Sequence, residues 1–225
     1  MDEFKILMEK LKSLGTEQNI KIYRKHGAKK DLYGVSFADL RKLAKEIKKN
    51  DELAEKLWYS NNEDAMSLAT IIADGKKFDL ERAGKWVKEI DFYPVADYFS
   101  KELLLKSKDI INIVQDFYKS KDEWKGRVGW TLIALLAKKS NLADEFFSNK
   151  VEIISENIHN EKNRKKEAMN NALIAIGLRN ENLKNKALEA ADKIGKVEID
   201  HGDTSCQTFD PREYIQRADK RRNKK

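Results

Sequence analysis

The stretch EKNRKKEAMNNALIAIGLRNENLKNKALEAADKIG, residues 161–195, decides the fold class. It predicts two helices, at about 161–179 and 181–194, with only the break Arg179-Asn180 between them. Residues of high helix propensity, chiefly Ala, Leu, Glu and Lys, fill both segments. A connection this short between two helices implies that they lie antiparallel. The stretch therefore predicts an antiparallel helix pair.

The same alternation of helix and short break runs through the rest of the chain. Two prolines, Pro94 and Pro211, and ten glycines are too few for an all-β fold, which needs turn residues about every 8–12 positions. A helix pair is too narrow to bury its own apolar face, so the pairs must stack in line. We therefore predict an all-α, HEAT-like α-α superhelical solenoid of antiparallel helix pairs over residues 1–195, and a C-terminal extension over 196–225.

The remaining helices are expected at about 2–14, 16–25, 37–50, 51–60, 62–74, 78–90, 93–106, 109–119, 122–139, 142–159 and 211–222. The helix at 37–50 has a clear start signal, because Ser36 can accept a hydrogen bond from the amide of Asp39 in a near capping box.

The net charge of +7 is unevenly distributed. Residues 212–225 contain seven basic and two acidic residues, a net charge of +5. The rest of the chain therefore carries only about +2. Two interpretations of this tail stay open, a phosphate-binding arm and a solubilising end.

The sequence also predicts the compartment. It has no run of about 18 apolar residues that could span a membrane, and its start, Met1–Phe4, lacks the pattern of a signal peptide. The single cysteine, Cys206, has no partner for an internal disulfide. These features predict a cytoplasmic protein with no membrane association.

The first candidate for chemistry is the segment around Tyr93 and Asp97. If 93–106 is helical, Pro94 fits its first turn, and Tyr93 and Asp97 lie one turn apart on the same side. A carboxylate beside an aromatic ring can stabilise a cationic ligand or transition state. The alternative is that the aromatic rings belong to the core and Asp97 forms a structural salt bridge.

The second candidate is Trp124-Lys125-Gly126-Arg127, followed by Gly129. Trp124 and Arg127 are three residues apart and share a helix face. Glycines are unfavourable inside a helix, so Gly126 and Gly129 indicate close approach of a neighbouring helix or of a ligand. Arg127 could bind phosphate or pair with an acidic side chain within the fold.

Lys162, Arg164, Lys165 and Lys166 form a basic cluster at a predicted helix start. Positive charge is unfavourable at that end of the helix dipole. The cluster is therefore a candidate for contacts with a DNA backbone, and a solvated helix face is the alternative.

His201, Asp203 and Cys206 have a spacing that could surround a zinc ion, but structural zinc sites need four ligands. A turn stabilised by Asp203 and by a buried Cys206 thiol is the preferred interpretation, and no metal site is predicted. The chain also lacks a glycine-rich phosphate loop, a His-Glu-x-x-His helix and a nucleophilic serine motif. We therefore expect no cofactor.

Several short motifs occur in order along the chain. They are His26-Gly27, Tyr33-Gly34-Val35, Leu40–Lys45, Leu57–Ser60, the helix Glu63–Ala73, Tyr93 with Asp97, and Trp124–Arg127. In this order the chain resembles the DNA alkylation repair family, the AlkD-like HEAT-repeat DNA glycosylases, over roughly residues 1–195.

The resemblance implies a DNA glycosylase that holds double-stranded DNA and releases cationic N3- or N7-alkylated purines. It implies that Asp97 is the catalytic carboxylate, Tyr93 an aromatic wall, and Arg127, beside Trp124, a backbone clamp. Tyr93 and Asn171 stand where active members of the family carry tryptophan, and an asparagine amide offers no π face. The alternative is therefore a non-catalytic HEAT-repeat scaffold that binds nucleic acid or a protein partner.

Overall fold

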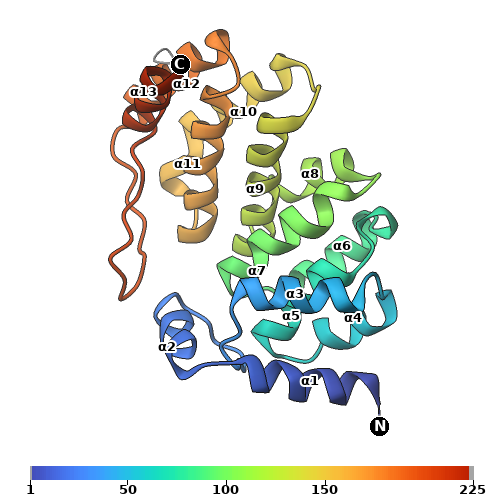
Figure 1. Cartoon of the computed structure of the whole chain (residues 1–225). Helices are drawn as coiled ribbons and strands as arrows, with labels where there is room; N and C mark the ends of the chain where they lie inside the picture. Colours follow the sequence, from blue (N-terminus) through green and yellow to red (C-terminus); the bar gives the residue numbers. More distant parts are fainter. Residues whose placement is uncertain (1, 223–225) are drawn as a thin grey trace. The chain divides into compact units, whose positions relative to one another are not determined.

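The structure, a computed structural model, describes residues 2–222, and nothing of the side chain of Arg222 (Figure 1). Lys224 and Lys225 of the basic tail lie outside the described residues. Within 2–222 the chain is helical, with one isolated bridge between Asp31 and Asn62 and no named strand. The helices are α1 (Glu3–Leu14), α2 (Glu17–Lys25), α3 (Phe37–Ile47), α4 (Asp51–Trp58), α5 (Glu63–Ile72), α6 (Leu80–Trp86), α7 (Tyr93–Tyr98), α8 (Ile110–Phe117), α9 (Glu123–Lys139), α10 (Asp144–Asn157), α11 (Asn163–Gly177), α12 (Glu181–Ile194) and α13 (Pro211–Arg222).

Every helix expected from the sequence is present, and the largest difference lies in 93–106. That segment is not one α-helix. It consists of the short α7, a π-helix over Phe99–Leu103 and a 3-10 turn over Leu104–Lys106. The near capping box is confirmed, because Ser36 Oγ accepts from the amide of Asp39 at 3.1 Å. Local side-chain caps of this kind fix where a helix starts.

The chain forms two compact units. The first contains the residues up to Ile113 together with His201–Ser205, and the second contains Val114–Asp200 and the residues from Cys206 onward. The predicted boundary after residue 195 is a different division and stays a prediction. No helix within residues 2–222 is long and apolar enough to cross a membrane.

The core of the first unit is an aromatic cluster. The rings of Trp58 and Trp86 stack with centroids 4.4 Å apart, and Phe78 meets Trp86 edge-on at 4.8 Å. Phe99, from the π-helix, packs against Trp58 at 5.4 Å. All four side chains are buried. Since buried aromatic rings contribute large apolar areas and favour these geometries, the cluster joins α4 and α6 to the segment that follows α7.

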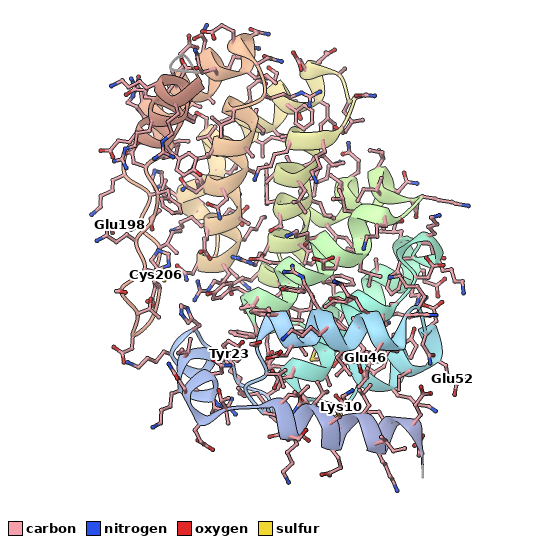
Figure 2. The ribbon with its side chains drawn as sticks, viewed as in Figure 1. Lys10, Tyr23, Glu46, Glu52, Glu198 and Cys206 are labelled. Atoms are coloured by element: carbon pink, nitrogen blue, oxygen red, sulfur yellow. The ribbon has the colours of Figure 1, made fainter. Side chains whose placement is uncertain are left out.

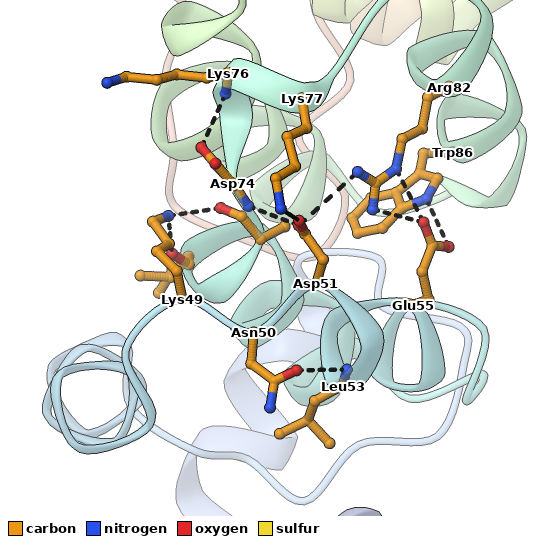
Figure 3. Close-up of polar contacts among 12 residues, drawn as sticks. Lys49, Asn50, Asp51, Leu53, Glu55, Asp74, Lys76, Lys77, Arg82 and Trp86 are labelled. Carbon is orange, nitrogen blue, oxygen red and sulfur yellow. Dashed lines mark hydrogen bonds and ion pairs between the residues drawn. The ribbon is translucent and has the colours of Figure 1, made fainter.

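Polar contacts at the ends of α4 and α5 lie around this aromatic core (Figure 3). Asn50 caps α4 by accepting from the amide of Leu53, and Lys49 Nζ donates to the carbonyls of Ile71 and Ala73 at the end of α5. These bonds satisfy backbone groups that a helix end leaves unpaired. On α1 and α3, Lys10 and Glu46 form an exposed ion pair of 2.6 Å (Figure 2), which adds little stability.

Asp64, in the first turn of α5, organises the loop that leads into α3. Its buried carboxylate accepts from three consecutive amides, those of Tyr33 at 2.6 Å, Gly34 at 3.0 Å and Val35 at 2.9 Å. Gly34 has a φ of +78°, and a Cβ there would lie 2.5 Å from the carbonyl oxygen of Thr16. The loop therefore requires glycine at this position.

In the second unit, the long helices α9 and α11 lie side by side, and α10 packs against α12 (Figure 1). Helix α11 also contacts α12 and α13. A Cβ on Gly126 would lie 2.5 Å from the Cδ atom of Lys165, and one on Gly129 would meet the backbone of Tyr118. The glycines of α9 thus permit close approach of neighbouring parts of the fold.

We predict that Asp64→Ala lowers the free energy of unfolding by about 3 kcal/mol or more, because it leaves buried amides without an acceptor. Urea denaturation followed by circular dichroism measures the change. Asp31→Ala is the matched control, because Asp31 is exposed and its contacts with Asn61 and Glu63 are made by its backbone. An equal loss in both variants would contradict the role given to the Asp64 carboxylate.

Candidate functional site

Helix α7 carries Tyr93 and Asp97, the two candidates of the first unit. Pro94 lies in its first turn, as expected. Val95 and Ala96 form the buried side of the helix. Tyr93 and Asp97 are both half-buried and one turn apart. The π-helix that follows begins at Phe99 and widens the helix directly after these side chains, a distortion often found at functional sites.

Tyr93 has a partner that the sequence did not indicate. Its hydroxyl lies 3.0 Å from Nδ1 of His26, and the two rings meet edge-on with centroids 5.9 Å apart. His26 is the C-cap residue of α2. The contact joins residues 67 positions apart in the chain. It holds the end of α2 to the first turn of α7.

A partly buried charged cluster lies where the chain enters α7. Lys30 Nζ forms an ion pair of 2.7 Å with Asp91 and donates to the carbonyl of Glu89. Glu63, at the start of α5, is only 2% exposed. Burial and the negative charge of Asp91 raise the pKa of Glu63 to about 7, against the opposing charge of Lys30. The raised pKa of Glu63 predicts that the charge next to the start of α7 changes near neutral pH.

In the second unit, Arg127 of α9 is used inside the fold. Its guanidinium is 3% exposed; it donates to Glu167 at 2.8 Å and to the carbonyl of Arg164 at 3.2 Å. Burial acts to raise the pKa of Glu167, but the charges of Arg127 and Arg164 outweigh it and hold this pKa below its ordinary value. Arg127 therefore holds α11 against α9. Trp124, on the same helix, is half-buried.

The four cationic residues at the start of α11 divide into two kinds. Lys165 is buried and donates to Glu161 and to the carbonyl of Ser120, while Arg164 pairs with Glu167. Lys162 is exposed and Lys166 half-buried. Lys162 and Lys166 are thus better placed to meet an external phosphate than Lys165.

Asn171 is exposed on α11, whereas its neighbour Asn170 is buried and donates to the carbonyl of Phe209. In the turn after residue 200, Asp203 lies 3.7 Å from Lys25. The expectation of a buried thiol is wrong, because Cys206 is exposed. Among residues 2–222, no group of three or more His, Cys, Asp or Glu side chains is placed to hold a metal ion.

The sequence did not predict the contact of His26 with Tyr93, the Lys30–Asp91–Glu63 cluster or the identity of the acidic partner of Arg127. It does contain a further signal of a basic surface: the thirteen residues from Gln18 to Lys30 contain no acidic residue, and five of them are basic. Four of those five side chains are exposed. The ion pairs and the Tyr93–His26 contact had no comparable signal, because they join residues far apart in the chain.

Comparison with known proteins gives a consistent result. Residues 7–205 match the model of a family described as DNA alkylation repair enzyme. The uncharacterized proteins Lin0241 of Listeria innocua serovar 6a and Lmo0209 of Listeria monocytogenes serovar 1/2a are each 30% identical to this chain. The first match spans 99% of this chain and 100% of the relative, and the second 97% and 98%.

A solved structure is 32% identical, with a TM-score of 0.89, and the match covers 98% of this chain and 95% of the other. It is described as representing a new family of proteins related to the HEAT-like repeat DNA glycosylases with affinity for branched DNA structures. The prediction of an all-α, HEAT-like fold is thereby confirmed.

We predict that Glu63→Gln changes how stability depends on pH. Between about pH 4.5 and 7 the unfolded wild-type chain loses the Glu63 proton while the folded chain keeps it. The free energy of unfolding of the wild type therefore falls as pH rises through this range, by up to about 3 kcal/mol. The variant lacks this contribution, so it gains stability relative to the wild type between about pH 5 and pH 8.

Urea denaturation of the wild type and of Glu63→Gln at about pH 5 and pH 8 measures the change in the free energy of unfolding. Glu52→Gln, at an exposed carboxylate on α4, is the control and should follow the wild type. If the wild type and Glu63→Gln change in parallel with pH, Glu63 does not titrate as the structure indicates.

Proposed function

We propose that this chain, which belongs to the DNA alkylation repair enzyme family, binds DNA and prefers branched DNA to a linear duplex. The observation that carries the proposal is its similarity, over 98% of its length, to a protein with affinity for branched DNA structures. The net charge of +7 is compatible with a polyanionic partner. Neutralising phosphates with lysine and arginine supplies most of the affinity of such proteins for DNA.

The second unit offers a defined backbone contact for this function. Lys162 is the N-cap residue of α11, and Lys166 lies in its first turns. The pair of Arg127 with Glu167 and the bond from Lys165 to the carbonyl of Ser120 hold this end of α11 in place. Two cationic side chains on a fixed helix lose less freedom on binding than the same charges on a mobile tail. In this proposal Arg127 and Lys165 position the contact, and Lys162 and Lys166 make it.

We predict that Lys162→Ala with Lys166→Ala weakens binding to a four-way DNA junction. The loss of two phosphate contacts should reduce the slope of log K against log salt concentration by about 1.8. Fluorescence anisotropy of a labelled junction and of a linear duplex of equal length, over a salt series, measures affinity, preference and slope.

The matched control is Lys138→Ala with Lys139→Ala, which removes the same charge from the exposed end of α9 in the same unit. Salt-independent or absent binding of the wild type would defeat the proposal and leave a protein partner as the remaining choice. Equal effects of the two pairs would show that net charge, and not the start of α11, is what matters.

Base excision is the second candidate function, and the placement of Asp97 on α7 favours it. In this scheme, a cationic alkylated purine leaves without the help of a strong acid. The carboxylate of Asp97 stabilises the positively charged sugar and positions the attacking water, as carboxylates do in glycoside hydrolysis. Tyr93 would face the cationic base. Asn171 supports binding without excision, because its exposed amide cannot replace an aromatic wall.

For this second candidate, we predict that wild-type protein releases 7-methylguanine from duplex DNA faster than buffer does, and that Asp97→Asn loses most of this release, by about 100-fold or more. Chromatography of the free base measures the rate. Asp91→Asn is unsuitable as a control because of its ion pair with Lys30, so Asp31→Asn serves instead. Release by the wild type no faster than in buffer would exclude excision while leaving DNA binding intact.

A further inference from the structure

Helix α2 is unusual in how it is attached to the first unit. None of its residues is buried. It is held instead by directional bonds: the Tyr23 hydroxyl donates to the carbonyl of Val35, and the Asn19 amide donates to the carbonyl of Gly34. The His26–Tyr93 contact fixes its end. Figure 2 marks Tyr23 on this helix. The ring of Tyr23 also packs against Phe37 and Phe92, with centroids 5.9 and 6.3 Å apart. Polar contacts therefore act together with this ring packing, because α2 has no fully buried apolar face of the kind that holds most helices in place.

The outer side of α2 and of the loop after it is cationic. From Gln18 to Lys30 there is no acidic residue, and Lys21, Arg24, Lys25 and Lys29 are all exposed. The fifth basic residue, Lys30, differs from them, because its ammonium is paired with Asp91 inside the unit. We call Lys21, Arg24, Lys25 and Lys29 the α2 basic surface.

The stability of α2 explains the positive charge of only some residues of the α2 basic surface. Arg24 and Lys25 lie in the last turn, where positive charge is favoured by the helix dipole. Lys25 also lies 3.7 Å from Asp203. Lys21 lies in the middle of α2, and its placement four residues before Lys25 brings two like charges together, which is unfavourable. Lys29 lies beyond the end of the helix. Glu17 lies four residues before Lys21, a favourable spacing that offsets part of the repulsion between Lys21 and Lys25. Among the described residues, no ion pair within the fold is formed by the side chain of Lys21 or Lys29.

We propose that the α2 basic surface binds the phosphates of a DNA strand, as a second contact in addition to the one proposed at the start of α11. The polar bonds of α2 hold these cations in a fixed arrangement, and the His26–Tyr93 contact ties that arrangement to the helix that carries Asp97. The partner is a DNA backbone because the surface offers several positive charges and no acidic side chain of its own. The inference rests on the proposed DNA binding and adds the N-terminal surface to it.

The test uses Lys21→Ala with Lys29→Ala, because these two residues serve neither the helix dipole nor an internal ion pair. Binding of the full-length protein to a labelled four-way DNA junction is measured over a salt series. We expect affinity to fall roughly three- to tenfold at low salt, and the slope of log K against log salt concentration to shrink by about 1.8. Unchanged circular dichroism spectra and melting temperatures show that the fold is intact.

Lys5→Ala with Lys12→Ala is the control, because it removes the same charge from exposed positions of α1 in the same unit. It should leave affinity and slope close to those of the wild type. The inference is overturned if the α2 pair binds like the wild type, or if the α1 pair weakens binding equally. Either result leaves the proposed function standing, whereas a wild type that binds no DNA overturns both.

Discussion

The contact of the Asp64 carboxylate with three consecutive amides sets the geometry of the first unit. It fixes the loop through Gly34, whose carbonyl accepts from Thr16 at the start of α2 and from Asn19 one turn later. Helices α2, α3 and α5 therefore meet at one loop. Because a buried carboxylate without donors would be very unfavourable, the loop and α5 fold only together. The orientation of α2, and with it the α2 basic surface, follows from this contact.

The second unit shows how charge is divided between folding and function. Arg127 and Lys165 are buried. Arg127, on α9, pairs with Glu167 of α11, and Lys165, on α11, donates to the carbonyl of Ser120, just before α9, and pairs with Glu161. A buried pair of this kind adds little net stability, but breaking it is costly. These residues therefore fix the register of α9 against α11. Cationic side chains that face solvent, such as that of Lys162, are accessible to a polyanion.

Binding and excision place different demands on the same residues. Excision of a cationic base needs a carboxylate and aromatic faces, and the chain supplies Asp97 and Tyr93 but an exposed amide at Asn171. The hydroxyl of Tyr93 is also engaged with Nδ1 of His26, 3.0 Å away. Binding a phosphate backbone needs only fixed cations. The exposed amide at Asn171, which belongs to the second unit, is the feature that favours binding over excision.

The sequence by itself determined the helices, because caps such as Ser36 and the spacing of apolar residues act over a few positions. It also determined the all-α class and the family. It did not determine which charged residues face inward. For Arg127 the sequence left open a phosphate or an acidic partner, and only the fold placed Glu167, 40 positions away, against it. His26 had no visible connection with Tyr93, 67 positions away. Such partners are chosen by the packing of helices, since a local pattern carries no information on what a distant segment places opposite it.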